Sequence, residues 1–395
     1  MKTYSTIIII IFFISSCTHQ GYVPNVEQKK HKNNCTLIFS GTKEFELDDE
    51  TSYMMSYIQH VDNSGDAYLT FYNSYNTSIY LYSYESGQFI KKIHYEKEGP
   101  DGVGDMQGYF YANDDSIFVY SYWGGFLMHT NSDATVLSKE RLNSDALNAL
   151  TGKSENLDMI YPAPYLKTAT PMKKYGNKFI LGGFVAGEPT TETATNRPVC
   201  LLYDMEKHTV EYIINYPEQY AKYNWCGGFA YRLPCIDLNN EKIIVSFSAD
   251  HYLTSYSLKT GKQEKHYAGS SLIKGIKSYS EGKDAPCNGD REMEWFMYNP
   301  SYQNVLYDRY KKLYYRLAQL PVKDYRHGDY GNKKPTVVTV LDADMNYLGE
   351  ALLPENIKHE FACTFVSKDG LNIQVLTDNE DVITFNTYNF FPDEK

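Results

Sequence analysis

The stretch that decides the fold is IYLYSYESGQFIKKIHYEKEGPDGVGDMQGYFYANDDSIFVYS, at residues 79–121. It opens with an aromatic and β-branched strand, turns at Glu85-Ser86-Gly87 and continues as a second strand. Glycine supplies the positive φ that a tight turn needs, so this pattern predicts a β-hairpin. A crossing rich in glycine and proline, at residues 99–104, then leads into another strand pair.

Strand pairs of the same kind recur along the chain. Residues 252–258 run into a Lys-Thr-Gly turn, and residues 361–367 meet Asp369-Gly370 before the next strand at 371–376. The chain also contains 38 tyrosines and 19 phenylalanines. Aromatic and β-branched residues suit the pleated, half-buried surface of a sheet, so the composition favours an all-β protein.

The predicted hairpins fall into six units of two to four strands each. Repeated short strands at this scale are typical of a β-propeller, in which each blade is a four-stranded sheet. The last unit lacks an outer strand, which we expect the N-terminal strand at 35–47 to supply, closing the ring and removing an exposed edge. Two insertions, 143–171 and 269–293, and one helix candidate, 137–150, complete the pattern. The six units span residues 54–96, 107–142, 172–216, 227–268, 294–352 and 358–391.

Two stretches carry a family resemblance. Residues 79–121 resemble the passage from blade to blade in six-bladed, NHL-like propellers. The stretch VLYDRYKKLYYRLAQLP, at residues 305–321, is similar to one found in the DUF4221 family of Bacteroides-type lipoproteins. The resemblance implies a single propeller domain over residues 35–395 and a location in the cell envelope. It implies no activity, because one fold hosts many unrelated functions.

The N-terminus predicts export and lipid anchoring. Lys2 precedes an unbroken apolar run at 7–14, and Ser15, Ser16 and Cys17 follow. This order is typical of a secretory signal, and the run is too short to span a membrane. Ile14 to Cys17 resembles a bacterial lipobox, which implies a signal peptide over 1–17 and a diacylated Cys17 as the mature N-terminus. The alternative is an ordinary signal peptide with an incidental cysteine.

The polar residues that follow Cys17 lack an apolar period and predict a flexible tether over 18–34. Thr18 stands directly after the anchor, and no acidic run follows it. In some bacteria an acid at that position retains lipoproteins in the inner membrane, and in Bacteroides-type cells an acidic run favours surface display. We therefore expect the protein at the outer membrane, facing the periplasm.

The net charge narrows the class of partner, and the cysteine content bears on disulfide formation. The net charge of −11 argues against a nucleic-acid partner, which requires a basic patch. Besides Cys17 there are six cysteines, and an exported protein permits disulfides. Their pairing is open, buried free thiols are an equal alternative, and the close spacing of two of them would allow a bridge across one hairpin. The six are Cys35, Cys200, Cys226, Cys235, Cys287 and Cys363.

The motifs of known chemistry are absent or stand in the wrong context. The glycines at 99–104 precede a strand, whereas a dinucleotide-binding loop opens a helix. Residues 342–346 begin like a calcium loop, but Tyr347 occupies the position that needs glycine. The chain contains no His-Glu-x-x-His and no Gly-x-Ser-x-Gly motif. We therefore predict no metal, no cofactor and no catalytic residue from sequence.

Two aromatic and basic segments are candidates for ligand binding, because tyrosine, tryptophan and arginine dominate binding hot spots. The first lies at 223–232 and the second at 307–316. The alternative for both is packing between blades and ion pairing between strands. The residues selected are Trp225, Arg232, Asp308, Tyr310, Tyr315 and Arg316.

These observations favour a membrane-anchored, non-catalytic propeller that binds a protein or glycan partner. The alternative is an enzyme, a hydrolase or lyase acting on an envelope or dietary polymer. Its site would lie at the mouth of the central channel and take residues from several blades, so it would leave no linear motif.

Overall fold

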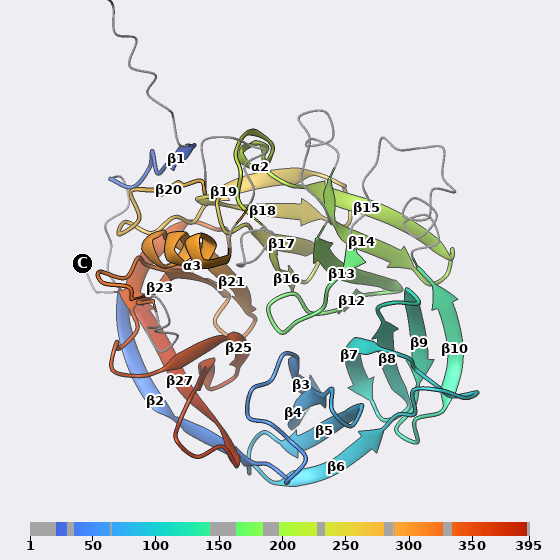
Figure 1. The fold of residues 1–395 in the computed structure, drawn as a ribbon. Helices are drawn as coiled ribbons and strands as arrows, with labels where there is room; N and C mark the ends of the chain where they lie inside the picture. Colours follow the sequence, from blue (N-terminus) through green and yellow to red (C-terminus); the bar gives the residue numbers. More distant parts are fainter. Residues whose placement is uncertain are drawn as a thin grey trace, which may run out of the picture.

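The computed structural model describes residues 21–29, 35–63, 65–142, 163–184, 197–226, 234–279, 287, 289–326 and 334–392. Within these ranges six large sheets stand as blades around a central channel (Figure 1). The predicted six-bladed β-propeller is therefore confirmed. Each of the six predicted units corresponds to one of these sheets.

The strands of each blade follow one another from the channel outward. Blade one comprises β3 (Ile58–Asn63), β4 (Asp66–Asn73), β5 (Ser78–Ser83) and β6 (Phe89–His94). Blade two comprises β7 (Met106–Asn113), β8 (Ser116–Ser121), β9 (Phe126–Thr130) and β10 (Val136–Arg141). Blade three comprises β11 (Ala163–Pro164), β12 (Lys173–Tyr175), β13 (Lys178–Phe184), β14 (Pro198–Asp204) and β15 (Thr209–Asn215). Blade four comprises β16 (Cys235–Asn239), β17 (Lys242–Ser246), β18 (Tyr252–Ser257) and β19 (Gln263–Tyr267). Blade five comprises β21 (Ser301–Asp308), β22 (Leu313–Gln319), β23 (Thr336–Leu341) and β24 (Tyr347–Leu352). Blade six comprises β25 (His359–Ser367), β26 (Gly370–Val375), β27 (Val382–Pro392) and β2 (Cys35–Glu46).

The ring is closed by the two ends of the chain, as the sequence predicts. β2 pairs with β27 in antiparallel fashion, from Cys35 opposite Pro392 to Glu46 opposite Val382. The N-terminal strand thus becomes the outer strand of the last blade. Phe45, which is fully buried, packs its ring against Tyr82 of blade one and Phe385 of blade six. The closure therefore joins the two ends of the chain by backbone hydrogen bonds within blade six, and it joins blades one and six through apolar contacts.

Tyrosine rings fill much of the space between neighbouring blades. Tyr57, Tyr109 and Tyr120 are among the fully buried rings, and their cluster combines residues of blades one, two and three. A buried phenol needs a hydrogen-bond partner, and the Tyr57 hydroxyl donates to the Tyr109 carbonyl oxygen at 2.6 Å. The high tyrosine content therefore serves the packing of blade against blade.

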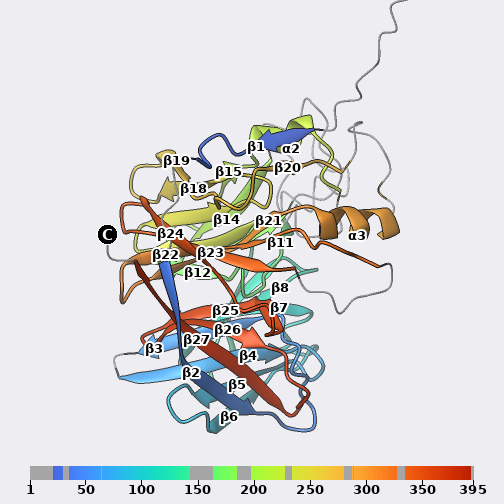
Figure 2. The same ribbon diagram turned by 90° about the vertical axis from the view of Figure 1, so that its left-hand side faces the viewer.

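The connections divide between the two faces of the ring. Because every blade begins at the channel, the turns between its first and second strands gather on one face. The links between second and third strands, and between blades, lie on the other. Helix α3 (Gly289–Tyr298) belongs to a link between blades and projects from that second face (Figure 2). The short helix α2 (Glu218–Lys222) also lies in such a link.

Two local expectations are wrong. The helix expected over 137–150 begins inside strand β10, where residues 136–141 pair with β9. The flexible tether expected over 18–34 does not hold for residues 21–29. There β1 (Tyr22–Pro24) pairs with β20 (Gly275–Lys277), and Asn25 is buried. Asn25 donates hydrogen bonds to the carbonyl oxygens of Ser270 and Ile273 at 3.0 and 2.9 Å. Both acceptors lie far from Asn25 in the sequence.

Among the cysteines whose side chains the structure describes, two form a disulfide and three are buried thiols. Cys226 is bonded to Cys287, so a hairpin bridge from Cys226 to Cys235 is excluded. Cys200, Cys235 and Cys363 are free and buried. Burial raises the pKa of the Cys235 thiol to about 12, which keeps it protonated and unreactive at neutral pH.

Candidate functional site

The central channel contains a pocket of about 520 Å³. Side chains from all six blades line it, and most come from the end of each innermost strand. The pocket therefore opens on the face that carries the turns between first and second strands. We call it the channel pocket.

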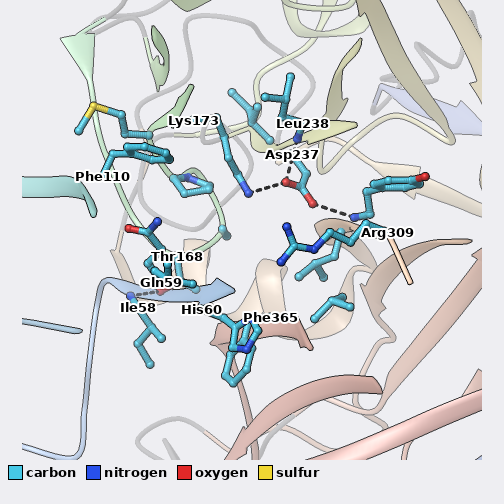
Figure 3. Close-up of a pocket in the computed structure, with 18 of the residues that line it drawn as sticks. Ile58, Gln59, His60, Phe110, Thr168, Lys173, Asp237, Leu238, Arg309 and Phe365 are labelled. Carbon is cyan, nitrogen blue, oxygen red and sulfur yellow. Dashed lines mark hydrogen bonds and ion pairs between the residues drawn. The ribbon is translucent and has the colours of Figure 1, made fainter. Parts of the chain in front are cut away.

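The floor of the channel pocket is an irregular part of blade three. Between β11 and β12 the innermost strand leaves its sheet, and a turn at residues 167–170 enters the channel. The Thr168 hydroxyl accepts a hydrogen bond from the Ile58 backbone N–H of blade one at 2.9 Å (Figure 3). The Ala169 carbonyl oxygen accepts one from the Ile236 N–H of blade four, also at 2.9 Å. The turn is thereby held across the channel.

One wall carries an ion pair between blades three and four, and a hydrogen bond connects this pair to blade five. Lys173 of blade three lies 2.7 Å from a carboxylate oxygen of Asp237 of blade four (Figure 3). Asp237 also accepts hydrogen bonds from the backbone N–H of Leu238 at 2.8 Å and from that of Tyr307, in blade five, at 2.7 Å. A carboxylate with three donors is fixed in position, and charge-assisted bonds of this kind are the strong ones.

The mouth carries a second charged group that reaches across blade six. The Arg309 guanidinium of blade five lies 3.1 Å from the Asp62 carboxylate of blade one. The Tyr310 hydroxyl donates a hydrogen bond to the same carboxylate. That hydrogen bond, supported by the charge of Arg309, lowers the pKa of Asp62, so this carboxylate stays ionised. The Arg309 side chain is 56% exposed, which leaves it accessible from solvent.

His60 adds an apolar and neutral surface to the pocket. Its ring stacks on Phe365 with the ring centroids 5.3 Å apart (Figure 3). It also meets the ring of Tyr84 edge-on. Burial, followed by the nearby charge of Arg309, lowers the pKa of His60 to about 4. The imidazole is therefore neutral at physiological pH, and it offers a flat ring face rather than a charge.

Of the residues selected from sequence, Tyr310 lines the channel pocket. Trp225 is 4% exposed and donates to the Gln219 carbonyl oxygen, so it belongs to the packing around α2. Tyr315 is buried against Phe390. Asp308 is buried and accepts hydrogen bonds from two backbone N–H groups of the turn that follows it. Trp225, Tyr315 and Asp308 therefore stabilise the fold and present no surface to a ligand.

Arg316 is also structural. It is fully buried, stacks over the Tyr302 ring at 3.8 Å and donates to three carbonyl oxygens and the Ser246 hydroxyl. Cys17 and Arg232 lie outside the described residues, so their predicted roles remain predictions.

The sequence offered one usable signal for the pocket residues that were missed. Side chains alternate along a strand, so alternation places Tyr307 and Arg309 on a face opposite Asp308 and Tyr310. Tyr307 lines the pocket and Asp308 is buried, as alternation predicts. Arg309 and Tyr310 follow the end of the strand at Asp308, and both line the pocket. Asp62, Lys173 and Asp237 stand in no recognisable motif, and nothing local marks them.

Among the described residues, one group has the composition of a metal site: Cys226, Cys287 and Glu292. Its two sulfur atoms form the disulfide, so this group cannot supply thiolate ligands. None of the helices in the described part of the chain combines the length and apolarity that crossing a membrane requires.

Known proteins place the fold in a family. The family model of DUF4221, a domain of unknown function, matches residues 34–352. A DUF4221 protein of Bacteroides vulgatus superimposes with a TM-score of 0.74 at 20% identity, over 91% of this chain and 99% of its own. A Bacteroides fragilis protein, provisionally described as exported, gives 0.54 at 12% identity, over 91% and 98%. No curated protein matches. Since the family model covers most of its length, the chain belongs to the DUF4221 family.

Proposed function

We propose that this chain is a lipid-anchored cell-envelope protein whose propeller binds a glycan in the channel pocket. The observation that carries the proposal is a single pocket of about 520 Å³ into which all six blades contribute side chains. Pockets for small ligands typically enclose about 300–1,000 Å³ and place a few polar groups among apolar walls. This pocket has that size, and its walls combine apolar side chains with several charged ones.

The arrangement of charge favours a neutral, polyhydroxylated ligand. Both carboxylates of the pocket walls have cationic partners, Asp237 with Lys173 and Asp62 with Arg309. A ligand of either sign would have to compete with one member of a pair. The remaining cation of the lining, Lys174, is directed to the Gly176 carbonyl oxygen, to which it donates at 2.7 Å. Sugar hydroxyls can donate to the carboxylates and accept from the cations at once. The ring of His60, which is stacked on the buried Phe365, adds an apolar surface beside these groups.

The proposed location rests on the N-terminal sequence. A basic start, the apolar run at 7–14 and the small residues before Cys17 support export and lipidation. The provisional description of the Bacteroides fragilis neighbour agrees with export. We propose the periplasmic face of the outer membrane as the site of anchoring. A protein partner that inserts a polar group into the same pocket is the second candidate.

The test is glycan binding by the full chain, first on an array and then by calorimetry. Arg309→Ala should weaken binding about tenfold, because a hydrogen bond to a charged group contributes about 1.5–3 kcal/mol. Lys207→Ala is the matched control, since the Lys207 side chain is 71% exposed in a turn between outer strands. Equal affinities of the two variants, or the absence of any retained glycan, would contradict the proposal. Chemical conversion of a retained glycan would support the enzyme alternative instead.

A further inference from the structure

The strand pair β1–β20 has two different faces. Val23 and Ile276 point inward and pack in the apolar cluster of blades three to five. Tyr22, Pro24 and Val26 point outward and are exposed, and so are Leu272, Lys274 and Lys277 around β20. The pair lies at the edge of the ring beside blade four (Figure 1). We call this outward surface the β1–β20 face.

The β1–β20 face is held rigidly against the propeller. The Val23 carbonyl oxygen accepts a hydrogen bond from the His251 imidazole at 3.1 Å, and the Gly21 carbonyl accepts one from the Ser278 N–H at 2.7 Å. The Tyr22 ring lies so close over Gly275 that a Cβ there would stand 2.2 Å from it. The exposed side chains are therefore carried by docked backbone.

Charge and aromatic character distinguish this region. The β1–β20 face continues into a groove of about 630 Å³ against α3. The groove is lined by three cations and one acid, whereas the chain as a whole carries a net charge of −11. Tyr22, Leu272 and Tyr298 are 44%, 48% and 42% exposed. The charged residues of the groove are Lys274, Lys277, Arg291 and Glu294.

We propose that the β1–β20 face lies on the surface of an anionic phospholipid membrane. The proposal rests on the proposed lipid anchor, because Cys17 precedes Gly21 by four residues, which span at most about 14 Å when extended. The docked strand thus keeps this edge of the ring close to the bilayer. Tyrosine favours the headgroup level, and lysines are attracted to an anionic membrane surface.

The experiment measures lysine acylation by mass spectrometry on the full lipidated chain. The protein is compared in detergent, in neutral phosphatidylcholine vesicles and in vesicles containing phosphatidylglycerol. Lys274 and Lys277 should react at least fivefold more slowly on the anionic vesicles than in detergent. On the neutral vesicles the slowing relative to detergent should be smaller. Lys207 and Lys368, whose side chains are 71% and 57% exposed, are internal controls whose rates should not change.

A paired substitution separates surface contact from mere proximity. Tyr22→Ser with Leu272→Ser should remove most of the protection while both reporter lysines remain. Tyr75→Ser, at a residue 83% exposed in blade one, should leave the protection unchanged. If the chain floats with vesicles but Lys274 and Lys277 react like Lys207, the membrane-facing surface is excluded. If the chain fails to float at all, the proposed anchor is wrong as well.

Discussion

Arg316 shows how a residue type suited to binding can serve the fold instead. The guanidinium is fully buried between blades four and five and donates to the carbonyl oxygens of Phe247, Asp250 and Ala268. Burial lowers its pKa to about 10, so the group remains charged at neutral pH. The planar fork reaches several carbonyl oxygens at once, which a lysine cannot do.

Removal of this side chain should be strongly destabilising. We expect Arg316→Met to lower the free energy of unfolding by about 3 kcal/mol or more, because several buried carbonyl oxygens would lose their donor. Arg309→Met should cost less than about 1 kcal/mol, since Arg309 forms an exposed ion pair. Urea unfolding of both variants measures the difference, and equal losses would contradict the structural role of Arg316.

His60 predicts how stability depends on pH. The folded state keeps the imidazole neutral down to a pKa of about 4, whereas the unfolded chain takes up the proton near the ordinary histidine pKa of 6.5. Between these values the unfolded state binds more protons, so stability falls as the pH drops from about 6.5 to about 4. Each pH unit in this window is worth up to about 1.4 kcal/mol for one imidazole.

The variant His60→Phe removes this titration and keeps the stacking on Phe365. Urea unfolding of both proteins is measured at pH 7 and at pH 4.5. The free energy of unfolding that is lost between the two pH values should be about 2 kcal/mol smaller in the variant than in the native chain. His251, whose pKa burial also lowers to about 4, continues to contribute to both proteins. Identical pH dependence of the two proteins would show that His60 is not held neutral in the folded state.

At the scale of elements, β2 is the strand on which the ring depends. It pairs with β27 over almost its whole length and carries Phe45 into the junction of blades one and six. Phe39 lies on the same strand but is 55% exposed. The strand thus provides a matched pair of phenylalanines that differ mainly in burial.

Phe45→Ala should destabilise the protein by about 3–5 kcal/mol, the usual cost of truncating a buried phenylalanine. Phe39→Ala should cost less than about 1 kcal/mol, as is usual for surface changes. Denaturant unfolding followed by tyrosine fluorescence compares the two. A similar cost for both would mean that β2 closes the ring by backbone pairing alone.

At the scale of the whole molecule, the ring carries two separate surfaces to which we assign different proposed roles. The channel pocket opens among the turns that follow the innermost strands, while the β1–β20 face occupies the edge beside blade four. A ring tethered at one edge would leave the mouth of its pocket accessible to a ligand in the adjoining compartment. This arrangement fits a binding protein attached to a membrane.

Cys17→Ala tests the attachment. We expect the native chain to incorporate radiolabelled palmitate and to fractionate with the outer membrane, because two acyl chains anchor stably where one binds only marginally. The variant should lose the label and the membrane association. Cys35→Ala, a cysteine outside the lipobox, should keep both. Labelling that survives in Cys17→Ala would contradict lipidation at this position.

The architecture could be predicted from local patterns in the amino-acid sequence. Strand alternation and turn glycines act over a few residues, so the hairpins could be recognised locally, and their repetition predicted six blades with a shared last sheet. The site was decided by tertiary structure. Asp62 and Tyr310 stand 248 positions apart and meet only because the ring brings blades one and five to one channel. The docking of β1, the disulfide of Cys226 with Cys287 and the burial of Arg316 also depend on distant contacts, for which a local pattern carries no signal.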